Sequence, residues 1–246
     1  MIKRIEPAIF SGNKVTAFFT ESNRNSIHSR RDIPGFDLGL NTGSADEIIR
    51  QNYETLAEGL GTKNLKLALA RQVHATRIRA VSDPGIYEET DGLITTTREL
   101  ALGIQVADCA AVLVSDSKNG VIGAFHAGWR GAAGGIVPKG IEQMKELGSH
   151  TDQMNVYISP CISLKNFEVG EEVARQFPGE FCDFENYEKP HVDLKSFINY
   201  QLVQSGIPRD QIEVSADCTL DDQRFYSFRR ERERAGRMLA LIQLNN

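Results

Sequence analysis

FHAGWRG, at residues 125–131, follows an apolar run and gathers residue types that are scarce in the rest of the chain. It holds the single Trp and one of the five His residues, and the sequence VADC at 106–109 lies shortly upstream. Glycine lets a backbone turn sharply or approach a ligand closely, and His and Cys are metal ligands and candidate nucleophiles or bases. The stretch therefore predicts the wall of an active site.

Length and composition narrow the class of protein. With 246 residues, 41% of them hydrophobic, and no convincing internal break, we expect a single domain over residues 1–246. A net charge of −5 and a pI near 5.6 argue against general nucleic-acid binding. No apolar run approaches membrane-spanning length and no signal peptide is evident, which predicts a cytoplasmic protein. The widely spaced cysteines are expected to be free thiols or metal ligands.

Short apolar runs and amphipathic stretches alternate irregularly along the chain. Strands are expected at 66–70, 74–81, 100–106, 111–115, 121–125, 155–158 and 212–216. The dipeptide Asn119-Gly120 predicts a hairpin between two of them. A loop is expected over 21–36, and helices over 45–60, 131–147, 170–177 and 194–205. This mixture predicts an α+β fold, a layered sandwich of mixed β-sheets covered by helices.

His74, Cys109 and His126 carry the first chemical hypothesis. His74 is expected to open a strand, Cys109 to follow one and His126 to end one, and strand ends that are distant in sequence can converge. Two imidazoles and a thiolate suit a catalytic zinc ion, whose fourth position stays open for water or substrate. Zinc lowers the pKa of its bound water toward ~7.

The same residues also allow chemistry without a metal. Cys109 would then be a thiolate nucleophile, with His126 or His74 as its base. Asp108 or Asp91 would orient that base. A third interpretation treats Cys109 as a small buried hydrophobic residue, although Asp108 beside it would need a polar partner if it were buried. The spacing alone leaves these alternatives open.

Arginines crowd the C-terminal part of the chain. They are Arg224, Arg229, Arg230, Arg232, Arg234 and Arg237, with Glu231 and Glu233 between them. One interpretation is a solvated helix face with ion pairs. The other takes Arg229 or Arg230 as an anion site, because a guanidinium fork suits phosphate or carboxylate. Arg130 is a comparable candidate, and Trp129 would either stack on a planar base or pack in the core.

Several short segments occur in a characteristic order. They are QVH at 72–74, DGLIT at 91–95, ADC at 107–109, HAGWRG at 126–131, FEVG at 167–170, SFRR at 227–230 and GRM at 236–238. With these segments the chain resembles a bacterial family known as YfiH, laccase-domain or multicopper polyphenol oxidase, and purine nucleoside phosphorylase. Some of its members are named peptidoglycan editing factor. The resemblance covers nearly the whole chain and implies an α+β fold with mixed sheets and helical outer layers.

The resemblance also implies a site and an activity. One zinc ion per chain is expected on the catalytic residues His74, Cys109 and His126. The implied substrates are purine nucleosides, with phosphorolysis of adenosine, inosine or methylthioadenosine and deamination of adenosine. Substrate contacts are expected from Trp129, Arg130, Glu168, Arg229 and Arg230.

Some features bear on the chemistry without touching the zinc set. For proton transfer we consider Asp91, Glu168 and, last, Asp108, which adjoins a ligand. The family often has Thr-Arg near the N-terminus, where this chain has Glu21 after Thr20. Its Gly-Pro-x-Ile-Gly pattern appears here as SPCIS at 159–163. Both departures concern the range of substrates.

The family names raise further functions. A laccase needs several copper ions held mostly by imidazoles, whereas three of the five His residues, His28, His150 and His191, lie in polar segments and no His-x-His pair exists. Copper would instead replace zinc at the same three residues. An editing hydrolase would act on mis-aminoacylated UDP-muramyl precursors, and a non-enzymatic binding module is the third class. The expected partners are a purine nucleoside and phosphate, without nucleic acid or membrane, for a monomer or homodimer.

Overall fold

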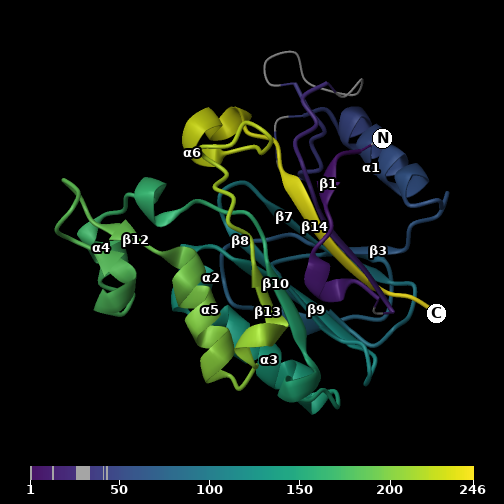
Figure 1. Ribbon diagram of the computed structural model, residues 1–246. Coiled ribbons are helices and arrows are strands. Elements are labelled where there is room, and N and C mark those ends of the chain that lie inside the picture. The colour runs from purple at the N-terminus through teal and green to yellow at the C-terminus, as the bar shows by residue number, and fades with distance from the viewer. Residues whose placement is uncertain (1, 13, 26–33, 41, 43) are drawn as a thin grey trace.

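Two β-sheets packed face to face form the centre of the molecule (Figure 1). The computed structural model describes residues 2–12, 14–25, 34–40, 42 and 44–246. The first six-stranded sheet has the order β1 (Arg4–Ile5), β2 (Val15–Thr20), β14 (Met238–Leu244), β7 (Ala101–Val106), β3 (Leu67–Ala70) and β5 (Gly85–Tyr87). The second six-stranded sheet has the order β13 (Ile212–Val214), β10 (Asn155–Ile158), β8 (Ala110–Asp116), β9 (Val121–Ala127), β6 (Gly92–Thr95) and β4 (Ile78–Ala80).

Both large sheets mix parallel and antiparallel pairs. In the first, β3 is parallel to β5 and β7, while β14 is antiparallel to β2 and β7. In the second, β4 is parallel to β6, and β9 is antiparallel to both β6 and β8. A separate two-stranded sheet pairs β11 (Cys182–Asp183) with β12 (His191–Val192) in a lobe beside the main body (Figure 1).

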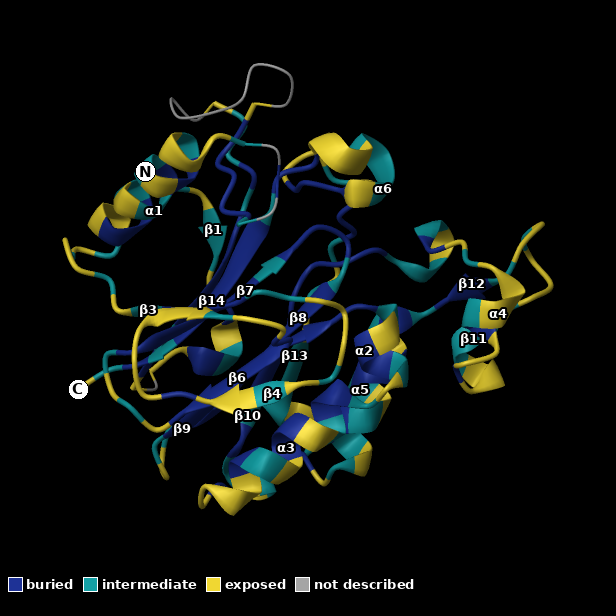
Figure 2. Ribbon diagram, turned by 180° about the vertical axis from the view of Figure 1, so that it is seen from behind, coloured by how far each residue is buried: buried dark blue, intermediate teal, exposed yellow. Residues whose placement is uncertain are grey.

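Helices cover the outer face of each sheet (Figure 2), so the molecule has four layers. The helix α1 (Asp46–Gly59) packs through Leu56 on the first sheet. The helices α2 (Trp129–Ala133), α3 (Ile136–Glu146) and α5 (Leu194–Gln204) pack on the second. Short helical segments complete the fold: α4 (Glu171–Ala174), α6 (Phe228–Glu231), η1 (Ala8–Phe10), η2 (Thr151–Gln153), η3 (Leu164–Asn166), η4 (Gly179–Phe181), η5 (Arg209–Gln211) and η6 (Arg232–Arg234).

Alternation of side chains across the strands creates the separate cores. In β2, Phe19 points into the space between the sheets, and Phe18 points outward against α1. In β8, Leu113 joins the inner core, while Val112 joins the outer core under α3 and α5. Successive residues of a strand face opposite sides, and here both sides are buried, so these strands read as continuous apolar runs. The predicted layered α+β sandwich is confirmed.

Most of the predicted elements are present with shifts of one or two residues. The helix expected over 45–60 is α1, and the helix expected over 194–205 is α5. The hairpin at Asn119-Gly120 joins β8 to β9. Of the loop expected over 21–36, residues 26–33 lie outside the described part of the chain.

Some predictions are wrong for identifiable reasons. The helix expected over 131–147 is broken in two because Gly135 has a φ of +77°, a left-handed conformation that ends α2 and begins α3. The strand expected over 74–81 is reduced to β4, since His74 has a φ of +61° and lies in a bend. The helix expected over 170–177 is only the short α4. Strands β2, β6 and β14 were not predicted, although all three are buried.

Candidate metal centre and pocket

Three connections that run from the first sheet to the second lie at one shared end of the sandwich. The carboxyl ends of β3, β5 and β7 lie together, because these strands are parallel in the first sheet. From there the chain crosses to β4, β6 and β8 of the second sheet. The antiparallel strand β9 finishes at the same end. His74, Asp91 and Cys109 lie in the three crossings and His126 near the end of β9, so the strand directions bring all four together.

His74, Cys109 and His126 form a group that can hold a metal ion. Their ligand atoms all lie within 4.8 Å of one another, and the two imidazole rings meet edge to face with centroids 4.8 Å apart. His126 is buried, Cys109 is partly buried and His74 is exposed, so the group is open to solvent on one side. The predicted three-residue set is therefore confirmed as a metal-capable arrangement.

The buried carboxylate of Asp91 organises two of these ligands. Its Oδ1 accepts hydrogen bonds from His126 Nδ1 at 2.8 Å and from the His74 amide at 2.9 Å. Its Oδ2 accepts from the amides of Ala75 at 2.8 Å and Val73 at 3.3 Å. These contacts fold residues 73–75 into the bend that replaces the expected strand. They also leave His126 Nε2 as the ring nitrogen for a metal, the arrangement typical of carboxylate-oriented histidine ligands.

Gly128 makes room for the metal centre. A Cβ atom at this position would lie 2.9 Å from Cys109 Sγ, 3.3 Å from His74 Cδ2 and 3.5 Å from His126 Nε2. A side chain here would fill the space that the three ligands enclose. The donor set of two imidazoles and one thiol, the oriented His126 ring and the missing side chain together fit a small soft or borderline ion such as zinc.

Cys109 and His126 shift each other's protonation. Burial raises the pKa of the Cys109 thiol, but the imidazoles of His126 and His74 lower it further, to about 6. Burial lowers the pKa of His126, but the Cys109 thiolate and the Asp91 carboxylate raise it to about 9. In Asp91, burial raises the pKa, whereas bonds from His126 and the Ala75 amide bring it below its usual value. The metal-free site therefore favours a thiolate beside an imidazolium, because each charge stabilises the other and the Asp91 carboxylate adds to the stabilisation of the imidazolium.

A pocket of about 440 Å³ opens from the three metal-capable residues. Its wall is part apolar and part cationic, with Trp129, Phe167 and Phe228 among its aromatic residues. Of the predicted substrate contacts, Trp129 and Arg229 line it. The lining also includes residues that were not predicted as contacts: Arg71, Gln72, Gln105, Val106, Ala107, Ile162, Phe167, Leu194, Phe228 and Arg237. The available signal was membership of the characteristic segments, since QVH, ADC, FEVG, SFRR and GRM contain Gln72, Ala107, Phe167, Phe228 and Arg237.

Gln72 and Gln105 hold two of the pocket's segments together. The Gln72 side chain donates to the Gln105 carbonyl at 2.8 Å and accepts from the Gln105 amide at 2.9 Å. The Gln105 side chain in turn accepts from the Leu40 amide at 3.2 Å and donates to the Tyr53 hydroxyl at 2.9 Å. The two hydrogen bonds between the Gln72 side chain and the Gln105 backbone fix the segment before His74 against β7, in the way that a paired residue of a neighbouring strand would.

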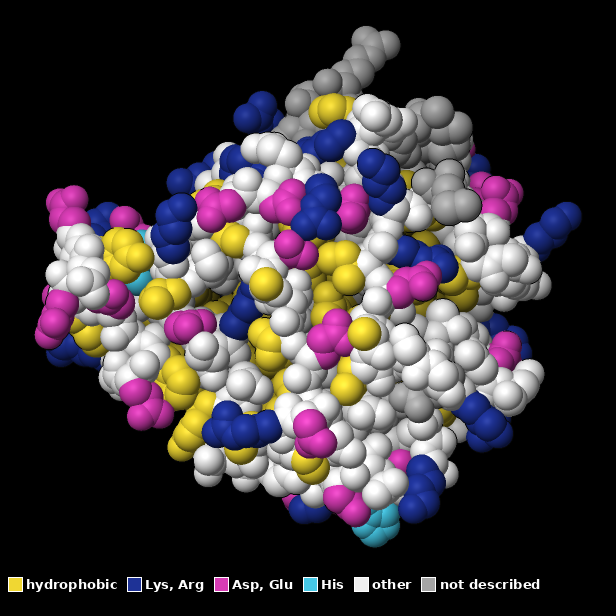
Figure 3. All heavy atoms as spheres, viewed as in Figure 1, with side chains coloured by type: hydrophobic (Ala, Val, Ile, Leu, Met, Phe, Trp, Pro, Cys, Tyr) yellow, Lys and Arg dark blue, Asp and Glu magenta, His cyan; other side chains and the backbone are white. Residues whose placement is uncertain are grey.

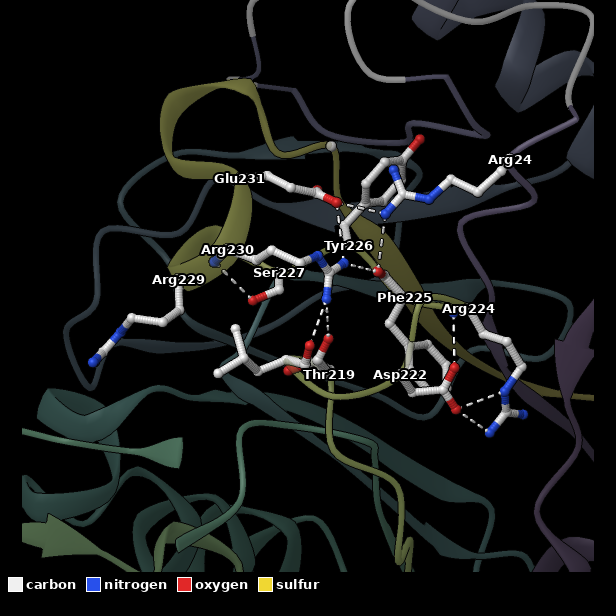
Figure 4. Close-up of polar contacts among 12 residues, drawn as sticks. Arg24, Thr219, Asp222, Arg224, Phe225, Tyr226, Ser227, Arg229, Arg230 and Glu231 are labelled. Carbon is white, nitrogen blue, oxygen red and sulfur yellow. Dashed lines mark hydrogen bonds and ion pairs between the residues drawn. The ribbon is translucent and has the colours of Figure 1, made fainter. Parts of the chain in front are cut away.

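Three other predicted contacts lie outside the pocket lining. Arg130 stacks over the ring of its neighbour Trp129, with Cζ 4.2 Å from the centroid. Glu168 is exposed and pairs with Lys189 at 2.8 Å. Arg230 turns into the protein, where its guanidinium donates to the carbonyls of Thr219, Leu220 and Phe225 and pairs with Glu231 (Figure 4).

The arginine-rich segment is thus neither a regular solvated helix nor one anion site. Figure 4 shows Arg229 pointing away from the network around Arg230, while Arg224 bonds Asp222 separately. Arg24 adds a further ion pair with Glu231. This network ties the C-terminal segment to the loop after Cys218, which is a structural role.

Asp108, the residue before Cys109, holds the arginine-rich C-terminal segment next to the metal-capable group through hydrogen bonds. Its buried carboxylate accepts from Thr219 Oγ1 at 2.6 Å, Ser227 Oγ at 3.0 Å and the Arg229 amide at 2.6 Å. The residue itself has a φ of +80°, a conformation that is uncommon outside glycine. Both carboxylate oxygens of Asp108 therefore accept hydrogen bonds within the protein, which supports placing Asp108 last among the candidates for proton transfer.

Comparison with known proteins places the chain in a family. The family described as "Multi-copper polyphenol oxidoreductase laccase" matches residues 16–245. The chain belongs to this family. Among laccase-family relatives, a protein of Deinococcus radiodurans named purine nucleoside phosphorylase is 36% identical over 216 residues, which cover 86% of this chain and 83% of that protein. Adenosine deaminase RL5, from an unknown prokaryotic organism, is 28% identical, with 91% of each chain covered.

Solved structures of the laccase family confirm the predicted family and fold. The hypothetical protein YfiH of Bacillus licheniformis superimposes with a TM-score of 0.91 at 28% identity, covering 100% of this chain and 97% of that one. Within the described residues, no helix is both long and apolar enough to cross a bilayer. Lys and Arg side chains alternate with Asp and Glu over the face drawn in Figure 3, so neither sign dominates that face.

Proposed function

We propose that the chain is a zinc-dependent purine nucleoside enzyme, which phosphorolyses adenosine, inosine or methylthioadenosine and deaminates adenosine. The observation that carries the proposal is the group of His74, Cys109 and His126 at the base of a pocket of about 440 Å³. This size suits a small ligand, and aromatic and cationic walls suit a planar base and an anion. The names of the Deinococcus and RL5 relatives support both reactions.

The chain's own residues divide the work in this proposal. His74, Cys109 and His126 would hold the zinc ion, which supplies Lewis acidity to the reacting group when it is bound. Asp91 fixes the His126 ring and the His74 backbone, so its four accepted hydrogen bonds suit an orienting carboxylate better than a proton carrier. Trp129 would flank the base, and Arg229 would hold the phosphate.

The polyphenol oxidase implied by the family's description is not proposed. Among the described residues, His74, Cys109 and His126 are the one group of three or more metal-capable side chains. His191 stacks on Tyr187 at 3.7 Å and its Nδ1 contacts the Leu164 carbonyl, so its ring serves packing. His28 lies outside the described part of the chain. Copper would bind at the same three residues as zinc and give a single-metal site.

Product analysis tests the proposal. Protein with measured zinc content is incubated with adenosine, with and without phosphate, beside the Cys109→Ala variant. Cys182→Ala is the matched control, since this partly buried thiol lies outside the pocket lining. We expect adenine or hypoxanthine only with phosphate, and inosine in either case, from the wild type and Cys182→Ala but not from Cys109→Ala.

The opposite result is equally informative. If zinc-loaded wild type forms no product from adenosine, inosine or methylthioadenosine, the proposal fails. The editing hydrolase would then be tested with UDP-muramyl-amino-acid substrates, whose released amino acid is a different product.

A further inference from the structure

Two of the three arginines that line the pocket, Arg229 and Arg237, differ from the third in having no salt bridge with a described residue. Among the described residues, no carboxylate lies within 4.0 Å of the guanidinium groups of Arg229 or Arg237, although both line the pocket. Arg71, the third arginine of the lining, pairs with Glu88 at 3.4 Å. Outside the pocket, Arg224 and Arg230 are both ion-paired. Within the described part of the chain, the pocket therefore contains two half-buried guanidinium groups that form no salt bridge, and the nearest charge effect is that of Arg229 on the exposed Glu168 carboxylate.

Both guanidinium groups are nevertheless held in place. Arg229 Nη2 donates to the Glu168 carbonyl at 3.0 Å. Arg237 Nη1 donates to the carbonyls of Ala235 at 2.6 Å and Gly236 at 3.1 Å. In each case one nitrogen is anchored to backbone, and the remaining N–H groups stay available to a ligand. Such pre-orientation reduces the entropy lost when an anion binds.

The backbones of the two arginines are fixed in the same way. The Arg229 amide donates to the buried carboxylate of Asp108 at 2.6 Å, and the Arg237 amide donates to that of Asp37 at 2.9 Å. Asp37 also accepts from Thr42 and Ser44, and Asp108 accepts from two hydroxyl groups. These aspartates thus position the chain through backbone amides and hydroxyl groups, and neither forms a salt bridge with the guanidinium group of the arginine whose amide it accepts.

Both arginines lie next to Phe228, which also lines the pocket. Arg229 follows Phe228 in α6, and the Arg237 Cζ lies 5.8 Å from the centroid of the Phe228 ring. Guanidinium groups that are fixed, planar and unpaired suit the oxygens of a phosphate. We propose that Arg229 and Arg237 form an anion subsite of the pocket that binds a phosphate dianion.

This inference rests on the proposed function for the identity of the anion. Phosphorolysis requires inorganic phosphate beside the nucleoside, whereas a nucleoside monophosphate would bring the same dianion on its ribose. The chemistry recognised by the two arginines is the same, and the two sources are separated by measuring binding of inorganic phosphate and of adenosine 5′-monophosphate.

The experiment compares Arg229→Gln, Arg237→Gln and Arg237→Lys with wild type, all zinc-loaded and with zinc content measured. Arg79→Gln is the matched control, since Arg79 is exposed on β4 and outside the pocket lining. Calorimetric titration gives the dissociation constant for each probe. Steady-state kinetics give separate KM values for phosphate and inosine. The unfolding temperature without ligand shows whether each variant is folded.

We expect each glutamine variant to weaken phosphate binding about ten- to hundredfold, with little change in the KM for inosine. The lysine variant should recover part of the loss, because it keeps the charge but not the fork. Adenosine 5′-monophosphate that binds more tightly than inorganic phosphate, and loses affinity in both glutamine variants, would support the subsite with a nucleotide as the source.

The two proposals fail in different ways. Phosphorolysis with an unchanged phosphate KM in both glutamine variants would overturn the anion subsite and leave the proposed function standing. Arginine-dependent phosphate binding without any nucleoside product would support the subsite and overturn the proposed function. Wild type that binds neither probe would overturn the subsite.

Discussion

Replacing Asp91 by Asn tests whether one carboxylate builds the metal centre. Four donors point at Asp91, two at each oxygen: His126 Nδ1 and the His74 amide at Oδ1, and the amides of Ala75 and Val73 at Oδ2. An Asn side chain offers one accepting oxygen and one donating NH₂ group. Whichever way the amide turns, two of the four donors lose their acceptor.

Both orientations damage metal binding. If the NH₂ group faces His126, Nδ1 must become an acceptor and the proton moves to Nε2, the nitrogen that would bind the metal. If it faces the amides of Val73 and Ala75, the bend that presents His74 opens. Loss of an orienting partner typically lowers metal affinity by about 10–100-fold. Two unsatisfied buried donors should also lower the free energy of unfolding of the metal-free protein by about 3 kcal/mol.

Asp116→Asn is the matched control. Asp116 is also fully buried and accepts from the Asn119 amide, the Asn119 side chain and the His150 amide, and it ends β8, the strand that begins directly after Cys109. It should lose stability but keep its zinc affinity. Zinc affinity is measured by competition with a chromophoric chelator, and stability by urea unfolding of the metal-free proteins. A zinc affinity for Asp91→Asn within twofold of wild type would refute the reasoning.

Three further changes probe the site and its support. Gly128→Ala should leave the fold intact but reduce bound zinc at least tenfold, because the new Cβ would lie 2.9 Å from Cys109 Sγ. Gly59→Ala is the control and should retain zinc, since its Cβ would meet only a methyl group at 3.5 Å. Metal analysis after dialysis compares the zinc content of the two variants. In metal-free protein, the Cys109 pKa of about 6 means that the reactive thiolate is present above pH 6 and is lost as the pH falls below it. Iodoacetamide should therefore modify Cys109 with a midpoint near pH 6, and a midpoint near the ordinary thiol value would show that His126 does not stabilise the thiolate. Arg230→Met removes the donors that serve three carbonyls and one carboxylate, and it should lower the free energy of unfolding by about 2–4 kcal/mol without changing phosphate binding. Urea denaturation measures the effect, and an unchanged urea midpoint would contradict the structural role.

The sequence predicts much of the fold because local signals agree with the tertiary environment. The amphipathic spacing of α1 and the Asn119-Gly120 hairpin are both local features, and both are present. The strands missed at β2 and β14 pair with each other from opposite ends of the chain, so no local pattern connects them. His74 was misplaced on a strand because its conformation depends on a carboxylate 17 residues away.

The site divides in the same way. The metal-capable residues were found because His and Cys are rare, chemically distinct and set in recognisable segments. The arginines could not be sorted, because all carry the same charge and several are close in sequence. Arg229 and Arg230 are neighbours, yet Arg229 lines the pocket, whereas the guanidinium group of Arg230 donates to three backbone carbonyls inside the protein. Only the three-dimensional positions of the acceptors distinguish the two side chains.

Strand direction explains why one end of the sandwich became the site. Each crossing from the first sheet to the second must turn a loop at this end, and the loops bring polar side chains to a place where the backbone leaves the sheets. Asp91 and Asp108 lie at two of these crossings, and their carboxylates accept hydrogen bonds from backbone amides and hydroxyl groups. The start of β14, opposite the end of β7, adds Arg237 to the same end. The crossings therefore carry His74 and Cys109, and through Asp91 and Asp108 they contact His126 and the Arg229 amide, so changes at the two aspartates should alter metal or anion binding and stability together.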